Sequence, residues 1–244
     1  MATDLVLTDA VRAQGQLEEL AGECDRLAEA LAARQREGFE LGARDFLFAA
    51  WSGEELGLLG SAHFTKTWAK MFGDEDAKLG GLFAACLNMD MIGRLRKSLI
   101  LQGVASSDRW PIEIEKRNIP VGLPIVTQND TYIPTDATSF YLREVPILSA
   151  FTGAHDEYHT PRDTPDLINY EGAQKISKFM GLVLRSLATS EDAPAYNEVA
   201  RPENQENRGG LRVYLGTIPD YAQGDIEGVK LSGVRKGAPA AEAG

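Results

Sequence analysis

Residues 44–61, RDFLFAAWSGEELGLLGS, combine a short apolar run with two adjacent glutamates. The run over residues 44–51 ends at Ser-Gly, and this pattern is typical of a strand that is buried on both faces of a parallel sheet. Glu54 and Glu55 follow the run almost directly. The stretch therefore predicts a buried strand that carries two carboxylates beyond its carboxyl end.

Further apolar runs predict other strands and helices of the same domain. The predicted strands are residues 81–91, 98–103 and 144–151. Apolar residues at helical spacing predict helices over residues 16–36 and near residues 170–188. Because strands alternate with helices along the chain, we expect a layered α/β domain.

The composition changes after this domain, which we place at residues 1–190. Residues 191–210 are polar and lack periodicity, and this pattern predicts a linker. Residues 211–244 contain two strand-like runs. The last segment is too short to fold alone as a domain of that kind.

The bulk properties exclude some classes of partner. A formal net charge of -11 argues against nucleic acid and anionic membrane surfaces as main partners. No apolar run approaches the roughly 18 residues that are needed to span a bilayer, so we expect no transmembrane segment. The first residues show no signal peptide. The sequence carries no indication of an oligomeric state.

Polar residues follow three of the predicted strands. Glu54 and Glu55 follow the first strand, Asp90 ends the second, and residues 153–166, GAHDEYHTPRDTPD, follow the strand that ends near residue 151. In an open α/β sheet, ligands and catalytic groups gather beyond the carboxyl ends of the strands. We therefore expect carboxylates and a histidine at one edge of the sheet.

This combination of side chains indicates a metal-dependent hydrolase. Carboxylates and an imidazole suit a borderline cation such as zinc. Neighbouring residues of an extended segment point in opposite directions, so Glu54 and Glu55 can have different tasks. One can bind the metal while the other accepts a proton from the water that the metal activates.

Each of these features also has a plain structural interpretation. The two glutamates could favour the N-terminus of a following helix through its dipole. Asp90 could pair with Arg94, because a carboxylate among apolar residues is costly unless it is paired or metal-bound. His155 and His159 could belong to a solvated acidic loop.

Four blocks of the sequence together resemble the family-28 zinc metallopeptidases. The blocks are FAAWSGEELGLLGS (48–61), LNMDMIGR (87–94), PTDATSFYLREVPIL (134–148) and GAHDEYHTPRDTPDLINYEG (153–172). These enzymes are bacterial aminopeptidases, and the group also contains glutaminyl cyclases. The resemblance implies a three-layer α/β/α zinc-exopeptidase-like fold, with a mixed sheet and helices on both faces.

The resemblance also implies a role for each matching residue. Glu54 would be the general base. Glu55 and His159 would bind a first zinc ion, and Asp90 would bind a second. The implied substrate is a peptide or protein, cleaved at its N-terminal peptide bond.

Two further residues would lie on the substrate side of the site. Tyr158 would contact the substrate or the tetrahedral intermediate. Asp136 falls in a block that commonly lines the site, and we do not expect it to be a metal ligand.

The resemblance extends past the catalytic domain, but it is incomplete at both ends. Residues 211–244 resemble the first part of a PDZ domain, which a subset of these peptidases carries. Two upstream ligands of the family, a histidine of a His-x-Asp motif and a bridging aspartate, have no counterpart in the sequence. We therefore expect a chain truncated at both ends, with one zinc ion or none in place of two, and a parent protein that is exported or periplasmic.

The leading hypothesis is a zinc-dependent exopeptidase, specifically an aminopeptidase, whose activity in this chain is weakened by the two absent ligands. One alternative is a catalytically inactive fragment that binds peptides. The other is a glutaminyl-cyclase-like acyltransferase.

Overall fold

The computed structural model describes residues 4–9, 29, 32–33, 36, 44–74, 76–200, 215, 217–219, 231–234, 237 and 239–243. The helix predicted over residues 16–36 lies outside the described residues, except at isolated helical positions. Most of the PDZ-like segment that is predicted over residues 211–244 also lies outside them.

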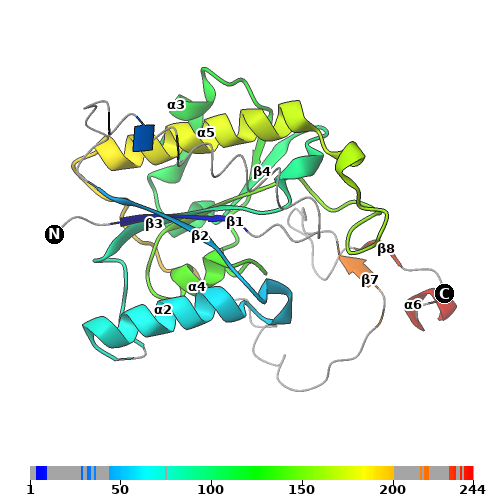
Figure 1. Ribbon diagram of the computed structural model, residues 1–244, viewed down its shortest axis with the longest axis horizontal. Helices are drawn as coiled ribbons and strands as arrows, with labels where there is room; N and C mark the ends of the chain where they lie inside the picture. The colour runs from blue at the N-terminus through cyan, green and yellow to red at the C-terminus, as the bar shows by residue number, and fades with distance from the viewer. Residues whose placement is uncertain are drawn as a thin grey trace.

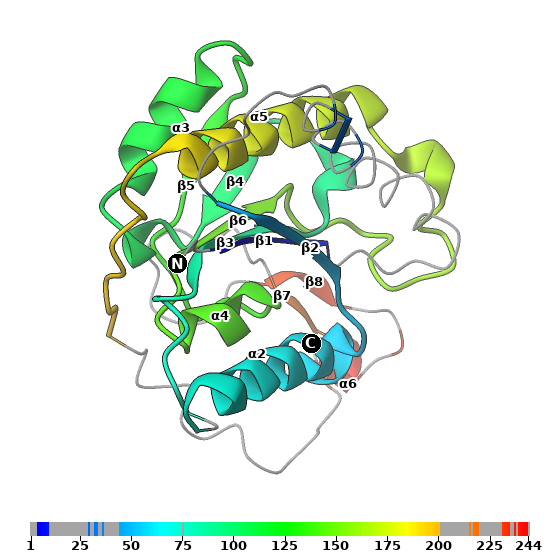
Figure 2. The ribbon, with the colours of Figure 1, turned by 60° about the vertical axis from the view of Figure 1, so that its left-hand side comes forward.

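A six-stranded sheet forms the centre of the described chain (Figure 1). Its strands lie in the order β2-β1-β3-β6-β4-β5 (Figure 2). The strands are β1 (Asp4–Asp9), β2 (Phe46–Ala50), β3 (Phe83–Met89), β4 (Leu99–Gln102), β5 (Ile125–Thr127) and β6 (Ile147–Phe151). β1, β2, β3 and β6 are parallel, whereas β4 pairs antiparallel with β6 and parallel with β5. The carboxyl ends of β2, β3 and β6 therefore lie at the same edge.

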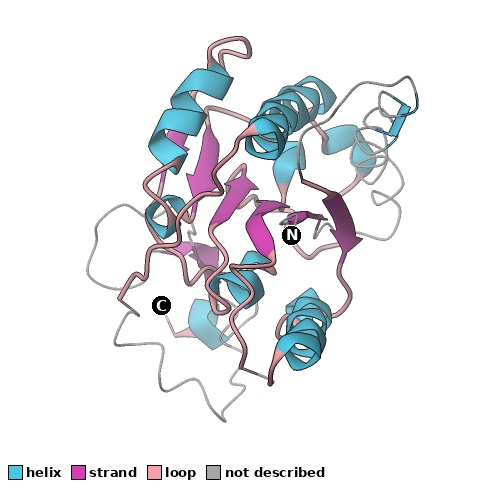
Figure 3. Cartoon of the chain, turned by 90° about the vertical axis from the view of Figure 1, so that its left-hand side faces the viewer, coloured by secondary structure: helices cyan, strands magenta, loops and turns pink. Residues whose placement is uncertain are grey.

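Helices cover both faces of this sheet, with α3 and α5 on one side and α2 and α4 on the other (Figure 2). The helices are α2 (Leu59–Phe72), α3 (Trp110–Asn118), α4 (Ala137–Tyr141) and α5 (Tyr170–Thr189). Short 3-10 turns are η1 (Glu54–Leu56), η2 (Ile92–Arg94), η3 (Val104–Ser106) and η4 (Pro165–Leu167). The strands lie between the two helical layers (Figure 3). The predicted three-layer α/β/α fold with a mixed sheet is thus confirmed.

The apolar runs of the sequence correspond to the buried strands because each central strand faces a hydrophobic core on both sides. β3 is buried along its whole length. Leu87 belongs to the core under α3 and α5, whereas Cys86 belongs to the core under α2 and α4. The alternation of side chains along a strand sends neighbouring residues to opposite cores, so no polar face is needed.

Residues 191–200 lie within the predicted linker, and they pack back against α4 and η3. The backbone N–H of Val199 donates to the hydroxyl of Tyr141 at 2.7 Å, and the backbone N–H of Asn197 donates to the carbonyl of Ser106 at 2.8 Å. The boundaries that were predicted at residues 190 and 210 stay predictions.

A separate two-stranded antiparallel sheet follows, formed by β7 (Thr217–Pro219) and β8 (Leu231–Val234). The short helix α6 (Pro239–Glu242) comes after it. Throughout the described residues, no helix combines the length and the apolar character that crossing a membrane requires.

The turn from β2 into α2 is tight, and it depends on glycine at three positions, one of which is Gly57 with φ 106°. Gly53 has φ 69° and begins the turn. Gly60 lies in the first turn of α2, where an added Cβ would be 2.8 Å from both the backbone nitrogen and the backbone oxygen of Ser52. The start of α2 can approach the end of β2 this closely only because Gly60 has no side chain.

We expect Gly60→Ala to destabilise the protein by about 1 to 3 kcal/mol, because the new methyl group overpacks against the backbone of Ser52. Ordinary helix propensity predicts the opposite sign, since alanine is favoured over glycine inside a helix. The free energy of unfolding from urea denaturation decides between them. Gly81→Ala is the matched control: its Cβ meets nothing within 4 Å, so a change within about 0.5 kcal/mol is expected.

Candidate active site

Glu54 and Glu55 lie in the 3-10 turn η1, between β2 and α2. The expectation of an extended segment is wrong here, because Gly53 and Gly57 on either side adopt the left-handed conformation and fold the chain into a turn. A 3-10 helix has three residues per turn, so successive side chains still point in different directions. This geometry allows Glu54 and Glu55 to have different tasks.

The helix-dipole interpretation of these glutamates finds no support in the structure. α2 begins at Leu59, and its first turn contains no acidic residue. Glu54 and Glu55 instead belong to the separate turn that precedes the helix.

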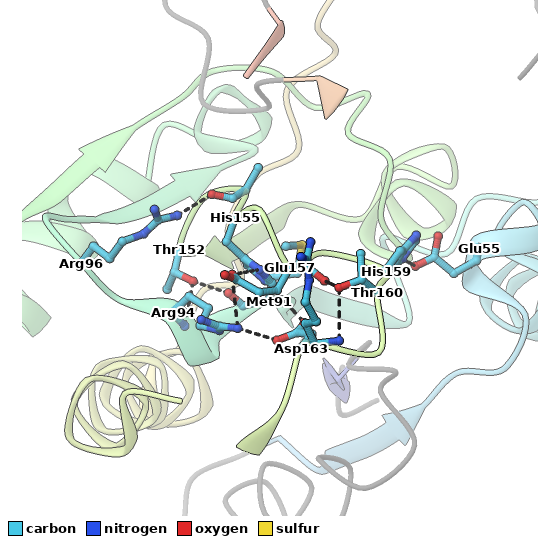
Figure 4. A network of polar contacts seen from close by, with 12 residues as sticks. Glu55, Met91, Arg94, Arg96, Thr152, His155, Glu157, His159, Thr160 and Asp163 are labelled. Atoms are coloured by element: carbon cyan, nitrogen blue, oxygen red, sulfur yellow. Dashed lines mark hydrogen bonds and ion pairs between the residues drawn. The ribbon is translucent and has the colours of Figure 1, made fainter. Parts of the chain in front are cut away.

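Glu55 meets His159 directly across the site. The Oε1 atom of Glu55 lies 2.6 Å from the Nε2 atom of His159 (Figure 4). The two side chains are 45% and 39% exposed, so solvent reaches both. The ring of Tyr158 stacks on the His159 imidazole, with 3.7 Å between ring centroids. The structure thus brings together a carboxylate and an imidazole that come from the ends of two different strands.

The backbone is strained where the candidate groups lie. Among the described residues, the non-glycine positions with positive φ are Leu58, Met91, Glu144 and His159. His159 is a candidate ligand, and Met91 directly follows Asp90. Such conformations cost energy and persist where the surrounding structure holds them, and they gather at functional sites. Glu144 precedes β6, but the other three positions follow β2, β3 and β6, so the strain agrees with a functional role for this edge of the sheet.

Asp90 leaves the sheet directly after β3, and its side chain is partly buried. Its backbone N–H donates to the carbonyl of Ala150 at 3.0 Å, which continues the β3–β6 pairing by one residue. Asp90 therefore reaches the same edge as Glu55 and as the loop that follows β6. The sequence analysis considered Arg94 as an ion-pair partner of Asp90. In the structure, the Nη2 atom of Arg94 lies 2.6 Å from the Oδ1 atom of Asp163.

The loop after β6 is solvated only in part, since the side chain of His159 is 39% exposed whereas other members of the loop are shielded. The side chain of His155 is only 7% exposed, and that of Asp163 is 16% exposed. Arg94, Glu157, Asp163 and His155 form a connected polar network within and beneath this loop (Figure 4). Sequence reasoning missed this network, because Arg94 and Asp163 lie far apart in the chain.

His155 titrates below its ordinary range because of this environment. Burial lowers the pKa of His155, and the positive charges of Arg94 and Arg96 act in the same direction. The carboxylates of Asp163 and Glu157 oppose this effect only in part. His155 is therefore neutral at pH 7.

Asp136 and Tyr158 have different positions relative to the site. Tyr158 lies against His159, as described above. Asp136 is fully buried and immediately precedes α4. Complete burial argues against a direct contact between Asp136 and a substrate.

Glu55 and His159 are the donors that the structure brings into contact. Within the described part of the chain, no group of three or more histidine, cysteine, aspartate or glutamate side chains could hold a metal ion. The site geometry on its own therefore supplies a pair of donors, with Asp90 ending the neighbouring strand.

The profile of Peptidase family M28 matches residues 25–184. No curated protein matches the chain. The LapA aminopeptidase of Legionella pneumophila is a similar solved structure, with a TM-score of 0.61 and 17% identity over 78% of this chain and 53% of that one. BSAP, a zinc aminopeptidase from Bacillus subtilis, has a TM-score of 0.60 and 16% identity over 82% of this chain and 50% of its own.

An aminopeptidase from Aneurinibacillus sp. strain AM-1 is also similar, with a TM-score of 0.54 and 17% identity over 82% of this chain and 46% of its own. At such identities the likeness establishes the fold alone. The chain spans about half the length of these solved structures.

The neutral state of His155 predicts a dependence of stability on pH. An unfolded chain protonates its histidines near pH 6.5, whereas the folded-state pKa of His155 is lower. Because the unfolded state binds the proton first, the free energy of unfolding should fall as the pH drops from about 6.5 toward that lower pKa. In His155→Gln this decline should be shallower. Urea denaturation across this range measures it, and equal slopes in the two proteins would contradict a buried, neutral His155.

Proposed function

The chain belongs to peptidase family M28, and on this premise we propose that it forms the metal-binding part of a zinc-dependent aminopeptidase that acts on peptides. The observation that carries the proposal is the 2.6 Å contact between Glu55 and His159. It lies at the edge of the sheet where β2, β3 and β6 end. Membership of the family indicates the class of reaction, and the contact between Glu55 and His159 indicates where the metal site lies.

The residues at this edge fit zinc in chemical kind. Carboxylate oxygen and imidazole nitrogen are typical zinc donors, and a catalytic zinc site commonly has three protein ligands. Glu55 and His159 would hold the ion, and their direct contact supports a common point of convergence. Asp90 is the further donor that we assign to the metal centre, for a second ion. When bound, zinc polarises the peptide carbonyl and lowers the pKa of a water molecule.

Glu54 is the general base in this proposal. It lies next to Glu55 in η1, and its side chain is partly buried. Its carboxylate accepts a proton from the attacking water and passes it to the leaving amine nitrogen. Since it leaves the turn in a different direction from Glu55, it can do this without giving up a metal ligand.

Tyr158 supports the site by restricting the imidazole that it stacks on. The near-parallel rings, with 21° between their planes, limit rotation of His159. Tyr158 is also the side chain that we place beside the substrate. Asp136 is buried directly before α4, and we assign it no contact with the metal.

We also propose that the chain is part of a longer protein that is exported from the cytoplasm and carries a PDZ domain that begins near residue 211. The antiparallel pairing of β7 with β8 agrees with a β-rich segment there.

A non-catalytic peptide-binding module is the second candidate function. It is favoured by the lack of a three-donor group among the described side chains. It predicts that the chain binds peptides without cleaving them, even at saturating zinc.

The Glu54→Gln variant tests the role of Glu54 in the hydrolysis step separately from metal binding. We expect the rate of hydrolysis of an aminoacyl p-nitroanilide to fall by about 10²- to 10⁴-fold, because the general base is lost. Zinc affinity, from competition with a chromophoric chelator, should stay the same. Glu115→Gln, at an exposed position of α3, is the matched control and should retain activity. Wild-type protein without any turnover at saturating zinc would favour the peptide-binding module.

Glu55→Gln and His159→Gln should each weaken zinc binding by more than about 100-fold, since loss of a direct ligand exceeds the 10- to 100-fold cost of losing an outer partner. The same chelator competition measures the change. His63→Gln replaces an exposed histidine of α2 and should leave zinc affinity unaltered. Wild-type affinity in either ligand variant would remove that residue from the metal site.

A further inference from the structure

An ion pair connects the two segments that carry Asp90 and His159. Arg94 ends η2, which begins two residues after Asp90. Its Nη2 atom lies 2.6 Å from Asp163 Oδ1. We infer that Arg94 and Asp163 are positioning residues: their ion pair holds the loop of residues 152–163 in the shape that presents His159 to Glu55. This inference extends the proposed function by naming what organises its site.

The loop is fixed to the Asp90 turn at both of its ends. At its start, the backbone N–H of Arg94 donates to the hydroxyl of Thr152 at 3.2 Å, and this hydroxyl donates to the carbonyl of Met91. At its far end, Asp163 binds the guanidinium of the same Arg94. One short turn of the chain, residues 91–94, therefore holds both ends of the loop (Figure 4).

His155 lies between two carboxylates of the same loop. Its Nδ1 atom lies 3.4 Å from Glu157 Oε2, and its Nε2 atom lies 3.6 Å from Asp163 Oδ2. The second carboxylate, Glu157, is 3.6 Å from the Arg94 guanidinium. Arg96 also donates to the carbonyl of Ala154. Besides its two ends, the loop is therefore in contact with Arg94 through Glu157 and with Arg96 through the carbonyl of Ala154.

The strained backbone of His159 explains why such support is needed. His159 has φ 55°, and a non-glycine residue keeps this conformation only where neighbouring contacts hold it. Its side chain is 39% exposed, so packing around the imidazole itself is limited. The ends of the loop are better shielded, since the side chains of Arg94 and Asp163 are only 15% and 16% exposed. Shielding from solvent makes this pair more effective than an exposed one.

The network also predicts an asymmetry between its members. Arg94→Gln leaves Asp163 and Glu157 close to each other around His155 without their main cation, so the carboxylates repel. Asp163→Asn leaves Arg94 with Glu157 still within 3.6 Å. Loss of Arg94 should therefore disturb His159 more than loss of Asp163, and the double variant should not be additive because the two residues share one contact.

Nuclear magnetic resonance of the metal-free protein provides the first test. The imidazole signals of His159, assigned with His159→Gln, report its contact with Glu55. In the wild-type background, Glu55→Gln should shift these signals. In the Arg94→Gln background, the same Glu55→Gln change should leave them almost unaffected, because the two side chains no longer meet. Arg94→Lys, which keeps the charge, should retain part of the coupling.

Zinc affinity is the second test, measured by chelator competition on variants whose fold is verified by circular dichroism. Arg94→Gln should weaken zinc binding by about 10- to 100-fold, as expected for an outer-shell partner, and Asp163→Asn should weaken it less. Arg143→Gln is the matched control, because it breaks an ion pair of 3.3 Å with Asp76, which is 97% exposed. It should change neither the His159 signals nor the affinity.

The two tests separate this inference from the proposed function. If the His159 signals of a folded Arg94→Gln still respond to Glu55→Gln as in the wild type, the positioning role is overturned, whatever the zinc result. If the wild type binds no zinc, the metal function fails, and the magnetic resonance test still decides the positioning role. If Arg94→Gln does not fold, Arg94→Lys and Asp163→Asn take its place, and unchanged His159 coupling in both overturns the inference.

Discussion

The common direction of β2, β3 and β6 is the constraint on which the candidate site depends. β3 is buried on both faces, and its pairing with β6 continues past its last residue, since the N–H of Asp90 donates to the carbonyl of Ala150. A strand held in this way cannot slip, because a one-residue shift would exchange the side chains of its two cores. The turns that leave these strands therefore start from fixed points. As a result, Glu55 and His159 meet although they lie 104 residues apart in the chain.

Beyond the sheet, rigidity comes from polar contacts and tight turns rather than from apolar packing. The turn after β2 is held by the close approach of Gly60 to Ser52, and the loop after β6 is held by Arg94, Thr152 and Asp163. Each supports a residue in the left-handed region, Leu58 in the first and His159 in the second. Local strain can persist at this edge because the hydrophobic cores on both faces stabilise the layers behind it.

Much of the fold could be predicted because burial is visible in the sequence itself. The apolar runs at residues 44–51, 81–91, 98–103 and 144–151 contain β2, β3, β4 and β6, and the helical repeat near residues 170–188 corresponds to α5. The shape of the turn at Glu54 could not be predicted in the same way. Besides Gly53 and Gly57, it includes Leu58 at positive φ. Leucine rarely adopts this conformation, so the sequence does not reveal it. The partner of Arg94 was also missed, because the nearby Asp90 is not the carboxylate that the structure places 2.6 Å from the guanidinium.

The sequence by itself determined the layered α/β class, four strands of the sheet and the kinds of side chain that follow three of them, but not β1, which pairs between β2 and β3. These properties belong to single segments, and apolar periodicity and residue chemistry record them directly. Only the tertiary structure decided that Glu55 contacts His159, that Asp163 binds Arg94 and that His155 is shielded and neutral. These are properties of pairs of distant segments. They depend on strand order, register and the depth of packing, which no single segment of the chain contains.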